Sequence, residues 1–92
     1  MYYVYMLLCC DDTIYTGIAT DVERRVEQHR SGRGARYTRG RGVKRLLYTE
    51  RKRNRSTASK REAEIKQMTR SEKLALVAAL EKLKLDVGRE RN

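Results

Sequence analysis

The sequence predicts an α+β fold, with a small three-stranded antiparallel sheet flanked by helices in the order ββαβαα. Two short runs with strand character, residues 2–9 and 13–18, lie on either side of the turn-forming pair Asp11 and Asp12. Three later segments show the apolar spacing of helices. One further strand-like run lies between the first and the second of these helical segments. Helices packed on one sheet would bury the apolar faces of all these elements.

The first two strands should form a hairpin whose register can be predicted. Residues 2–9 are apolar on both faces, which is typical of a central strand that is covered on both sides. Tyr5 and Tyr15 lie on the same face of the hairpin only if paired positions sum to an even number. We therefore expect an odd-numbered loop, with Cys9 opposite Thr13.

The first helix and the third strand follow from capping and spacing signals. The capping box Thr20–Glu23 predicts a helix that runs to about Arg30. Residues 31–42 are rich in glycine and arginine, and we expect a loop there. Residues 43–51 then have the character of a strand.

Two more helices complete the domain. Ser56 is the expected N-cap of a helix that ends near Met68, and the capping box Thr69–Glu72 opens the last one. A chain of 92 residues makes one domain, which we expect to span residues 1–85 with a frayed tail over 86–92.

The positive charge of the chain is concentrated in its middle part. The formal net charge is +10, and residues 21–61 hold fifteen lysines and arginines against four acidic residues. This density indicates a surface for a polyanion such as nucleic acid. A solvated basic surface with no specific partner is the alternative.

The sequence shows no sign of a membrane protein. No apolar run approaches the roughly 20 residues that span a bilayer, and no predicted helix pairs a basic face with a large aromatic one. The apolar stretch from Met1 lacks a basic leader and alternates in tyrosines, so we interpret it as a strand and not as a signal peptide. We expect a cytoplasmic protein.

The first predicted helix carries two polar side chains on its inward face. Val22, Arg25, Val26 and His29 follow the i, i+3, i+4, i+7 spacing and so share one face. A guanidinium on an inward face needs an anion, from the protein or from a ligand. The structural alternatives are an Arg25 that pairs with an internal carboxylate and a His29 that is hydrogen-bonded in the core.

The second predicted helix places a carboxylate near its apolar face. Glu62 shares a stripe with Ala58 and Ile65. Its structural alternatives are an ion pair with Arg25 and a place in a capping box begun by Ser59.

These side chains are of the types that hydrolysis of a phosphodiester needs. A carboxylate holds a divalent cation, an arginine neutralises the charge that develops on phosphate, and a hydroxyl or imidazole orients or deprotonates water. Taken singly, Tyr5 and Tyr15 are ordinary packing residues of a sheet. Their combination with Arg25, His29 and Glu62 is much harder to explain as core.

The same residues resemble the GIY-YIG nuclease superfamily, whose two name-giving triplets lie on adjacent strands and precede a helix with an arginine. The first triplet is Tyr3-Val4-Tyr5, the second is Tyr15-Thr16-Gly17, and Arg25 follows Tyr15 by ten residues. The run from His29 to Thr38 looks like the small stand-alone bacterial subgroup. The superfamily resembled here has the fold predicted above.

The resemblance implies a role for each matching residue. Gly17 would be structural at the site, Glu62 would be the metal ligand, and the catalytic set would be Tyr5, Tyr15, Arg25, His29 and Glu62. The sequence departs from the pattern in lacking the leading glycine of the first triplet and in having Thr16 at the centre of the second. Neither departure changes a side chain with a proposed chemical role. The late asparagine of some members has no well-placed counterpart.

The glycine- and arginine-rich loop is the expected contact surface for nucleic acid. Its glycines allow close backbone approach to phosphates, its arginines supply counter-charge, and its tyrosine can stack on a base. Phosphate contacts carry no sequence information, so we expect little sequence specificity. A disordered basic loop is the alternative. The predicted nucleic-acid-binding residues are Arg33, Arg36, Tyr37, Arg39 and Arg41.

The leading hypothesis is an endonuclease that depends on a divalent cation, Mg²⁺ or Mn²⁺, with DNA as the expected substrate and RNA as the alternative. Tyr15 would activate water, while Tyr5 and His29 would orient groups or shuttle protons. We expect Arg25 and Glu62 to face one cleft with Tyr15 without forming a buried ion pair. The alternatives are a non-catalytic DNA- or RNA-binding domain that keeps the nuclease fold and a ribosome-associated or nucleoid accessory protein.

Overall fold

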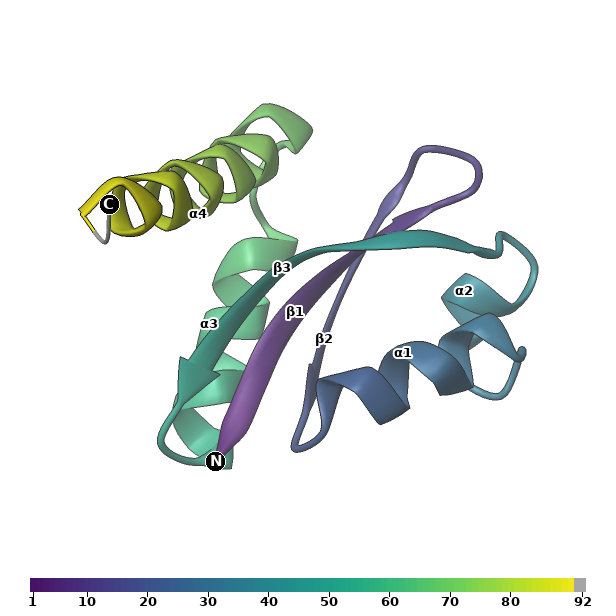
Figure 1. Cartoon of the computed structure of the whole chain (residues 1–92). Coiled ribbons are helices and arrows are strands. Elements are labelled where there is room, and N and C mark those ends of the chain that lie inside the picture. The colour runs from purple at the N-terminus through teal and green to yellow at the C-terminus, as the bar shows by residue number, and fades with distance from the viewer. Residues whose placement is uncertain (91–92) are drawn as a thin grey trace.

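The computed structural model describes the backbone of residues 1–90 and the side chains of residues 1–85, and it has the predicted α+β fold (Figure 1). The expected order ββαβαα is present, with one short helix added in the segment that was expected to be a loop. The elements in chain order are β1 (Tyr2–Cys9), β2 (Ile14–Ala19), α1 (Val22–Arg30), α2 (Arg36–Arg39), β3 (Val43–Lys52), α3 (Arg55–Lys66) and α4 (Arg70–Glu90).

The three strands form one antiparallel sheet in the order β2-β1-β3, so β1 is central, as its two apolar faces predict. Tyr5 pairs with Gly17, and the partner of Tyr15 lies two residues further along β1. The hairpin loop closes where the N–H of Cys9 donates to the carbonyl of Thr13 at 2.8 Å. The predicted odd-numbered loop is confirmed, and Tyr5 and Tyr15 therefore share a face.

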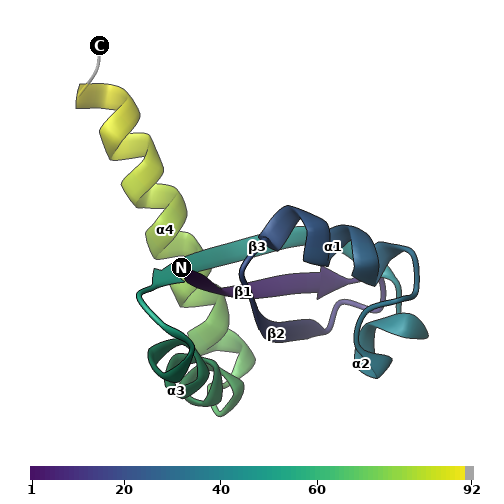
Figure 2. The same ribbon diagram turned by 90° about the horizontal axis from the view of Figure 1, so that it is seen from below.

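The sheet is covered by α1 on one face and by α3 on the other (Figure 2). Side chains alternate between the two faces along β1, which divides the core in two. The buried cluster on the α1 face is Tyr5, Leu7 and Val26. The cluster on the α3 face is Val4, Met6, Ala58, Ile65 and Val77.

Side-chain caps set the starts of the helices, and two of them correct the prediction. Asp21, not Thr20, caps α1, and Asn54, not Ser56, caps α3. Each accepts a hydrogen bond from the backbone N–H three residues on, at 3.1 and 2.9 Å. Asp and Asn rank at least as high as Ser and Thr at this position, which explains why they prevail. The capping box at residues 69–72 is confirmed.

The last helix, α4, continues to Glu90 and extends away from the sheet (Figure 2). The tail predicted over 86–92 therefore begins inside this helix, and residues 91–92 lie outside the described residues. Between residues 70 and 85, α4 adds to the core through its first part, since Val77 is buried whereas Leu83 is exposed. No helix within the described residues is long and apolar enough to cross a membrane.

Candidate active site

The hydroxyl of Tyr5 lies over the backbone of the neighbouring edge strand. A Cβ atom placed on Gly17 would lie 2.6 Å from Tyr5 Oη and 3.0 Å from Cε2 of Tyr15. The hydrogen of a glycine is therefore what leaves room for the ring of Tyr5 to cross β2. Gly17 was expected to be structural at the site, and this crossing is its physical reason.

His29 of α1 holds the hydroxyl of Tyr5 in place. Tyr5 Oη and His29 Nε2 are 2.8 Å apart, and Nδ1 of the same ring is 2.7 Å from the hydroxyl of Thr38. All three side chains are at most 1% exposed. Burial of the ring, and secondly the positive charge of Arg25, hold the pKa of His29 below its usual value of 6.5. The imidazole is therefore neutral at pH 7.

The depressed pKa of His29 predicts how folding stability depends on pH. The unfolded chain takes up a proton near pH 6.5 while the folded chain does not, so the free energy of unfolding should fall as the pH drops below about 6.5. His29 is the only histidine in the sequence, so no other imidazole contributes. Urea denaturation at several values between pH 7.5 and 5.5 measures the slope. His29→Gln should remove it, and a wild-type stability that is flat over this range would contradict a neutral buried His29.

The surroundings of Tyr5 favour its neutral form. Burial of the hydroxyl is the largest effect and, against the hydrogen bond and charge of Arg25, raises the pKa of Tyr5 to about 12. The charge of Glu62 makes a smaller contribution to this pKa, in the same direction as burial. Tyr5 thus keeps its proton at neutral pH, as suits a group that orients others.

Tyr15 is the more accessible of the two tyrosines. It is half-buried, and its ring centroid lies 6.3 Å from that of Tyr5 and 5.0 Å from that of His29. A third ring, Tyr37 of α2, lies 5.6 Å away on the same cluster. Tyr15 therefore borders solvent at the point where β2, α1 and α2 meet.

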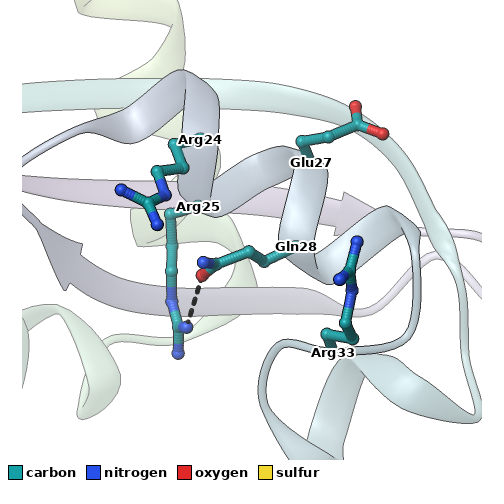
Figure 3. A pocket seen from close by; sticks show the side chains of 5 residues that line it. All are labelled: Arg24, Arg25, Glu27, Gln28 and Arg33. Atoms are coloured by element: carbon teal, nitrogen blue, oxygen red, sulfur yellow. Dashed lines mark hydrogen bonds between the residues drawn. The ribbon is translucent and has the colours of Figure 1, made fainter.

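The guanidinium of Arg25 borders a pocket beside α1. The half-buried Arg25 donates from Nη1 to Oε1 of Gln28 at 3.0 Å, which fixes the guanidinium through a neutral partner (Figure 3). Among the side chains of residues 1–85, no carboxylate forms an ion pair with it, so the internal pairing considered above is absent there.

The pocket itself has a volume of about 490 Å³ and a predominantly basic lining. Figure 3 shows the carboxylate of Glu27 pointing away from Arg25. Three guanidinium groups and one carboxylate border the space, which makes it suited to an anion. The lining residues are Arg24, Arg25, Glu27, Gln28 and Arg33.

Glu62 approaches the site from the other face of the sheet. It lies on α3, its side chain is 22% exposed, and its nearest ionic partner is Lys66 at 3.5 Å. It is not among the residues that line the pocket beside Arg25, and its charge contributes to raising the pKa of Tyr5. That Arg25 and Glu62 face one cleft with Tyr15 stays a prediction. Within the described residues Glu62 belongs to no group of three or more carboxylate, histidine or cysteine side chains arranged to hold a metal ion.

Residues 1–75 match the family model of the GIY-YIG catalytic domain. The chain belongs to the GIY-YIG family. This is a nuclease family, so membership implies nucleic acid as the class of substrate. The matched range contains every residue discussed above: the two tyrosines, Gly17, Arg25, His29 and Glu62.

Relatives of this GIY-YIG chain are similar over most of its length. A UPF0213 protein from Natronomonas pharaonis is 53% identical over 77 residues, which cover 84% of this chain and 91% of that protein. A UPF0213 protein from Clostridium perfringens is 46% identical over 79 residues, or 86% of this chain and 85% of that protein. These relatives confirm the predicted likeness to a small stand-alone GIY-YIG subgroup.

Two solved structures share both the sequence likeness and the fold. The solution NMR structure of a UPF0213 protein from Bacillus halodurans is 46% identical, with a TM-score of 0.55, and covers 86% of this chain and 85% of that one. The solution NMR structure of a protein from E. faecalis is 41% identical, with a TM-score of 0.57, and covers 91% of this chain and 86% of that one.

The basic segment of this GIY-YIG domain, residues 31–42, is partly helical. Its arginines differ in whether they are exposed or are engaged with other side chains. Arg33, Arg36 and Arg39 are exposed. Arg41 instead forms an ion pair with Asp11 at 3.1 Å and lies 4.0 Å above the ring of Tyr37. One face of that ring is therefore already covered, which limits the base stacking that was expected of it.

Three residues that shape the GIY-YIG site have no role in the sequence-based prediction. Thr38 falls in the segment predicted as a loop, Gln28 lies outside the inward stripe predicted for its helix, and Gly34 is one of several glycines in that predicted loop. A Cβ atom on Gly34 would lie 2.3 Å from His29 Nδ1, so only glycine fits there. The sequence signal that could have found them is their nearness to His29 and Arg25 in the chain.

Proposed function

We propose that this GIY-YIG domain is an endonuclease that depends on a divalent cation and hydrolyses phosphodiester bonds in nucleic acid with little sequence specificity; DNA is the favoured substrate and RNA the alternative. The observation that carries the proposal is the half-buried Arg25, which is held by a neutral amide beside a basic pocket and within reach of the Tyr5 hydroxyl. Because its partner is a neutral amide, the positive charge of this guanidinium is not neutralised there, and it can bind a phosphate.

The surroundings of each site residue determine the role that we propose for it. Arg25 would bind the scissile phosphate and neutralise the charge that develops on it. Tyr15, at the solvent edge of the cluster, would direct and activate the attacking water. Tyr5, which keeps its proton, and the neutral His29 would hold the reacting groups in register.

Glu62 is the residue that would hold the cation. Among the side chains of residues 1–85, the one ionic partner of its half-buried carboxylate is a flexible lysine, and one carboxylate together with water and substrate phosphates suits Mg²⁺ or Mn²⁺. A bound divalent cation would polarise the phosphoryl oxygen and stabilise the leaving oxygen. The chain itself fixes where the carboxylate lies, through Ala58 and Ile65, which anchor α3 to the sheet.

A non-catalytic nucleic-acid-binding domain is the second candidate. The observation in its favour is the position of Glu62, which is paired with Lys66 and lies outside the pocket that Arg25 borders. Such a domain would use the basic surface alone.

Cleavage of supercoiled plasmid tests the proposal directly. The wild type should nick it with Mg²⁺ or Mn²⁺ and stop when EDTA is added. Tyr15→Phe, which removes one hydroxyl and leaves the ring, should slow cleavage by about 10²–10⁴-fold while binding persists in a gel shift. Binding without cleavage by the wild type, under every cation tried, would replace the endonuclease by the binding domain.

The exposed arginines of the basic segment should dominate binding. Replacing Arg33, Arg36 and Arg39 by alanine should weaken affinity for all sequences alike and lower the salt slope by about 0.9 for each phosphate of duplex DNA that is no longer neutralised. The matched control replaces three exposed arginines at the opposite end of the molecule, near the start of α3 (Figure 1); they are Arg51, Arg53 and Arg55. Fluorescence titrations at several salt concentrations give both slopes. Equal decreases in the two variants would mean that the basic segment has no special role.

A further inference from the structure

The protonation of His29 can be read from a donor whose identity is certain. The backbone N–H of Ala35 lies 3.3 Å from His29 Nδ1 with hydrogen-bond geometry. An amide nitrogen only donates, so Nδ1 must accept and carries no proton. Since the ring is buried and neutral, its one proton is on Nε2, the nitrogen that faces Tyr5 at 2.8 Å.

The hydroxyl of Thr38 must then donate to the same nitrogen. Thr38 Oγ1 lies 2.7 Å from Nδ1, and a contact this short between two acceptors without a proton would be repulsive. The other acceptor within reach is the carbonyl of Ala35 at 3.0 Å. That carbonyl already accepts from the N–H groups of Thr38 and Arg39, at 3.2 Å each. Nδ1 is therefore the acceptor that needs the hydroxyl.

We propose that Thr38 is a positioning residue of the active site, whose hydroxyl donates to His29 Nδ1 and keeps the imidazole proton on Nε2. His29 then donates to the hydroxyl oxygen of Tyr5. The proton of Tyr5 then cannot point at His29 and is left for another acceptor, while Arg25, which only donates, can bond to the same oxygen. This consequence for catalysis rests on the proposed function, whereas the assignment of the tautomer does not.

The local structure is built around this arrangement. The turn before α2 brings the Ala35 N–H and the Thr38 hydroxyl to the same ring nitrogen, and Gly34 is the only residue type that lets the backbone come so close. The charged or titratable groups facing the ring are Tyr5 from β1, Tyr15 from β2 and Arg25 from its own helix. None of them offers a carboxylate that would favour the doubly protonated ring.

Nitrogen-15 NMR of the wild type tests the tautomer without any need for activity. The single histidine gives one pair of ring-nitrogen signals, and their shifts and two-bond proton couplings distinguish a protonated from an unprotonated nitrogen. We expect at pH 7.5 a protonated Nε2 and an unprotonated Nδ1. A protonated Nδ1 would overturn the proposal, because the hydroxyl of Thr38 would then be the acceptor.

Two substitutions test the role of the hydroxyl. Thr38→Val keeps the shape of the side chain but removes the donor, so the fraction of rings with the proton on Nδ1 should rise and the cleavage rate should fall between about 10- and 100-fold. Thr38→Ser keeps the donor and should restore both the tautomer and the rate to within about threefold of the wild type. An unchanged tautomer in Thr38→Val would overturn the proposal whatever the rate.

The outcomes also separate this proposal from the proposed function. A wild type that has the expected tautomer but cleaves no nucleic acid would leave Thr38 as the residue that positions His29 and remove the nuclease activity. Cleavage by a wild type whose Nδ1 is protonated would support the nuclease activity and overturn the role of Thr38. Should Thr38→Val fail to fold, the wild-type spectrum and Thr38→Ser still decide the assignment.

Discussion

Replacing Glu62 by glutamine should abolish cleavage that depends on a divalent cation while leaving the fold intact. Glutamine has the same shape but neither the charge nor the pair of acceptor oxygens that a hard cation needs. The only ion pair of Glu62 among the side chains of residues 1–85 is with the exposed Lys66 on the same helix. Its loss should change the free energy of unfolding by less than about 1 kcal/mol. Plasmid nicking and urea denaturation measure the two effects.

Glu64→Gln is the matched control for this experiment. Glu64 lies two residues further along α3, its side chain is 62% exposed, and it pairs with Arg61 at 3.0 Å. The same change of charge there should leave both cleavage and stability close to those of the wild type. If Glu62→Gln cleaves as well as Glu64→Gln, the carboxylate of Glu62 is not the metal ligand. If it instead unfolds readily, Glu62 is structural.

Gly17→Ala should damage both stability and activity, because the new methyl group occupies the place of the Tyr5 hydroxyl. Its carbon would lie 2.6 Å from Oη and 2.8 Å from Cζ of Tyr5, and the buried ring cannot swing away without leaving His29. Overpacking of this kind costs about 1–3 kcal/mol of stability. Displacing a group at the reacting centre by about 1 Å slows catalysis by about 100-fold.

Gly40→Ala is the control that shows whether the losses of stability and activity are specific to Gly17. The backbone of Gly40 has an ordinary φ of −88°, and a Cβ atom there would meet nothing within 4 Å. Its thermal midpoint and cleavage rate should match those of the wild type. The hydrogen bond between Tyr5 and His29 can be followed through the His29 ring signals, which should move in Gly17→Ala alone. A Gly17→Ala protein that behaves as Gly40→Ala would disprove the close crossing of Tyr5 over β2.

Most of the fold follows from local sequence signals. The apolar faces of residues 2–9 predict a central strand, and the parity argument for Tyr5 and Tyr15 predicts the register of the hairpin. The caps at Asp21 and Asn54 were missed because each stands close to a serine or threonine that also fits the capping pattern. Neighbouring cap candidates differ by less energy than the sequence alone can resolve.

The candidate site was predictable as a set of residues but not as a geometry. Helical spacing places Arg25 and His29 on one inward stripe, and the structure brings both beside Tyr5. Spacing within α3 also puts Glu62 near the apolar face of that helix. It does not say which face of the sheet α3 covers, since this depends on the long-range pairing of β3 with β1. That Arg25 and Glu62 both face one cleft with Tyr15 therefore stays a prediction.

The role of Thr38 shows a different limit of prediction. A four-residue helix such as α2 has no periodicity to detect, and the surrounding segment 31–42 is rich in glycine and arginine, which is typical of a loop. The helix is joined to the core by the hydrogen bond between the Thr38 hydroxyl and a buried ring nine residues earlier. No local pattern encodes such a contact.

The division of the core into two clusters means that the residues proposed to bind the cation and the phosphate can be adjusted separately. Glu62 moves with α3, whose position depends on Met6 and Ile65, while Arg25 moves with α1, which rests on Val26. A change of side-chain volume under one helix would shift one charged group and leave the other where it is. The distance between carboxylate and guanidinium is thus open to gradual change through ordinary apolar substitutions, with no alteration of either charged residue.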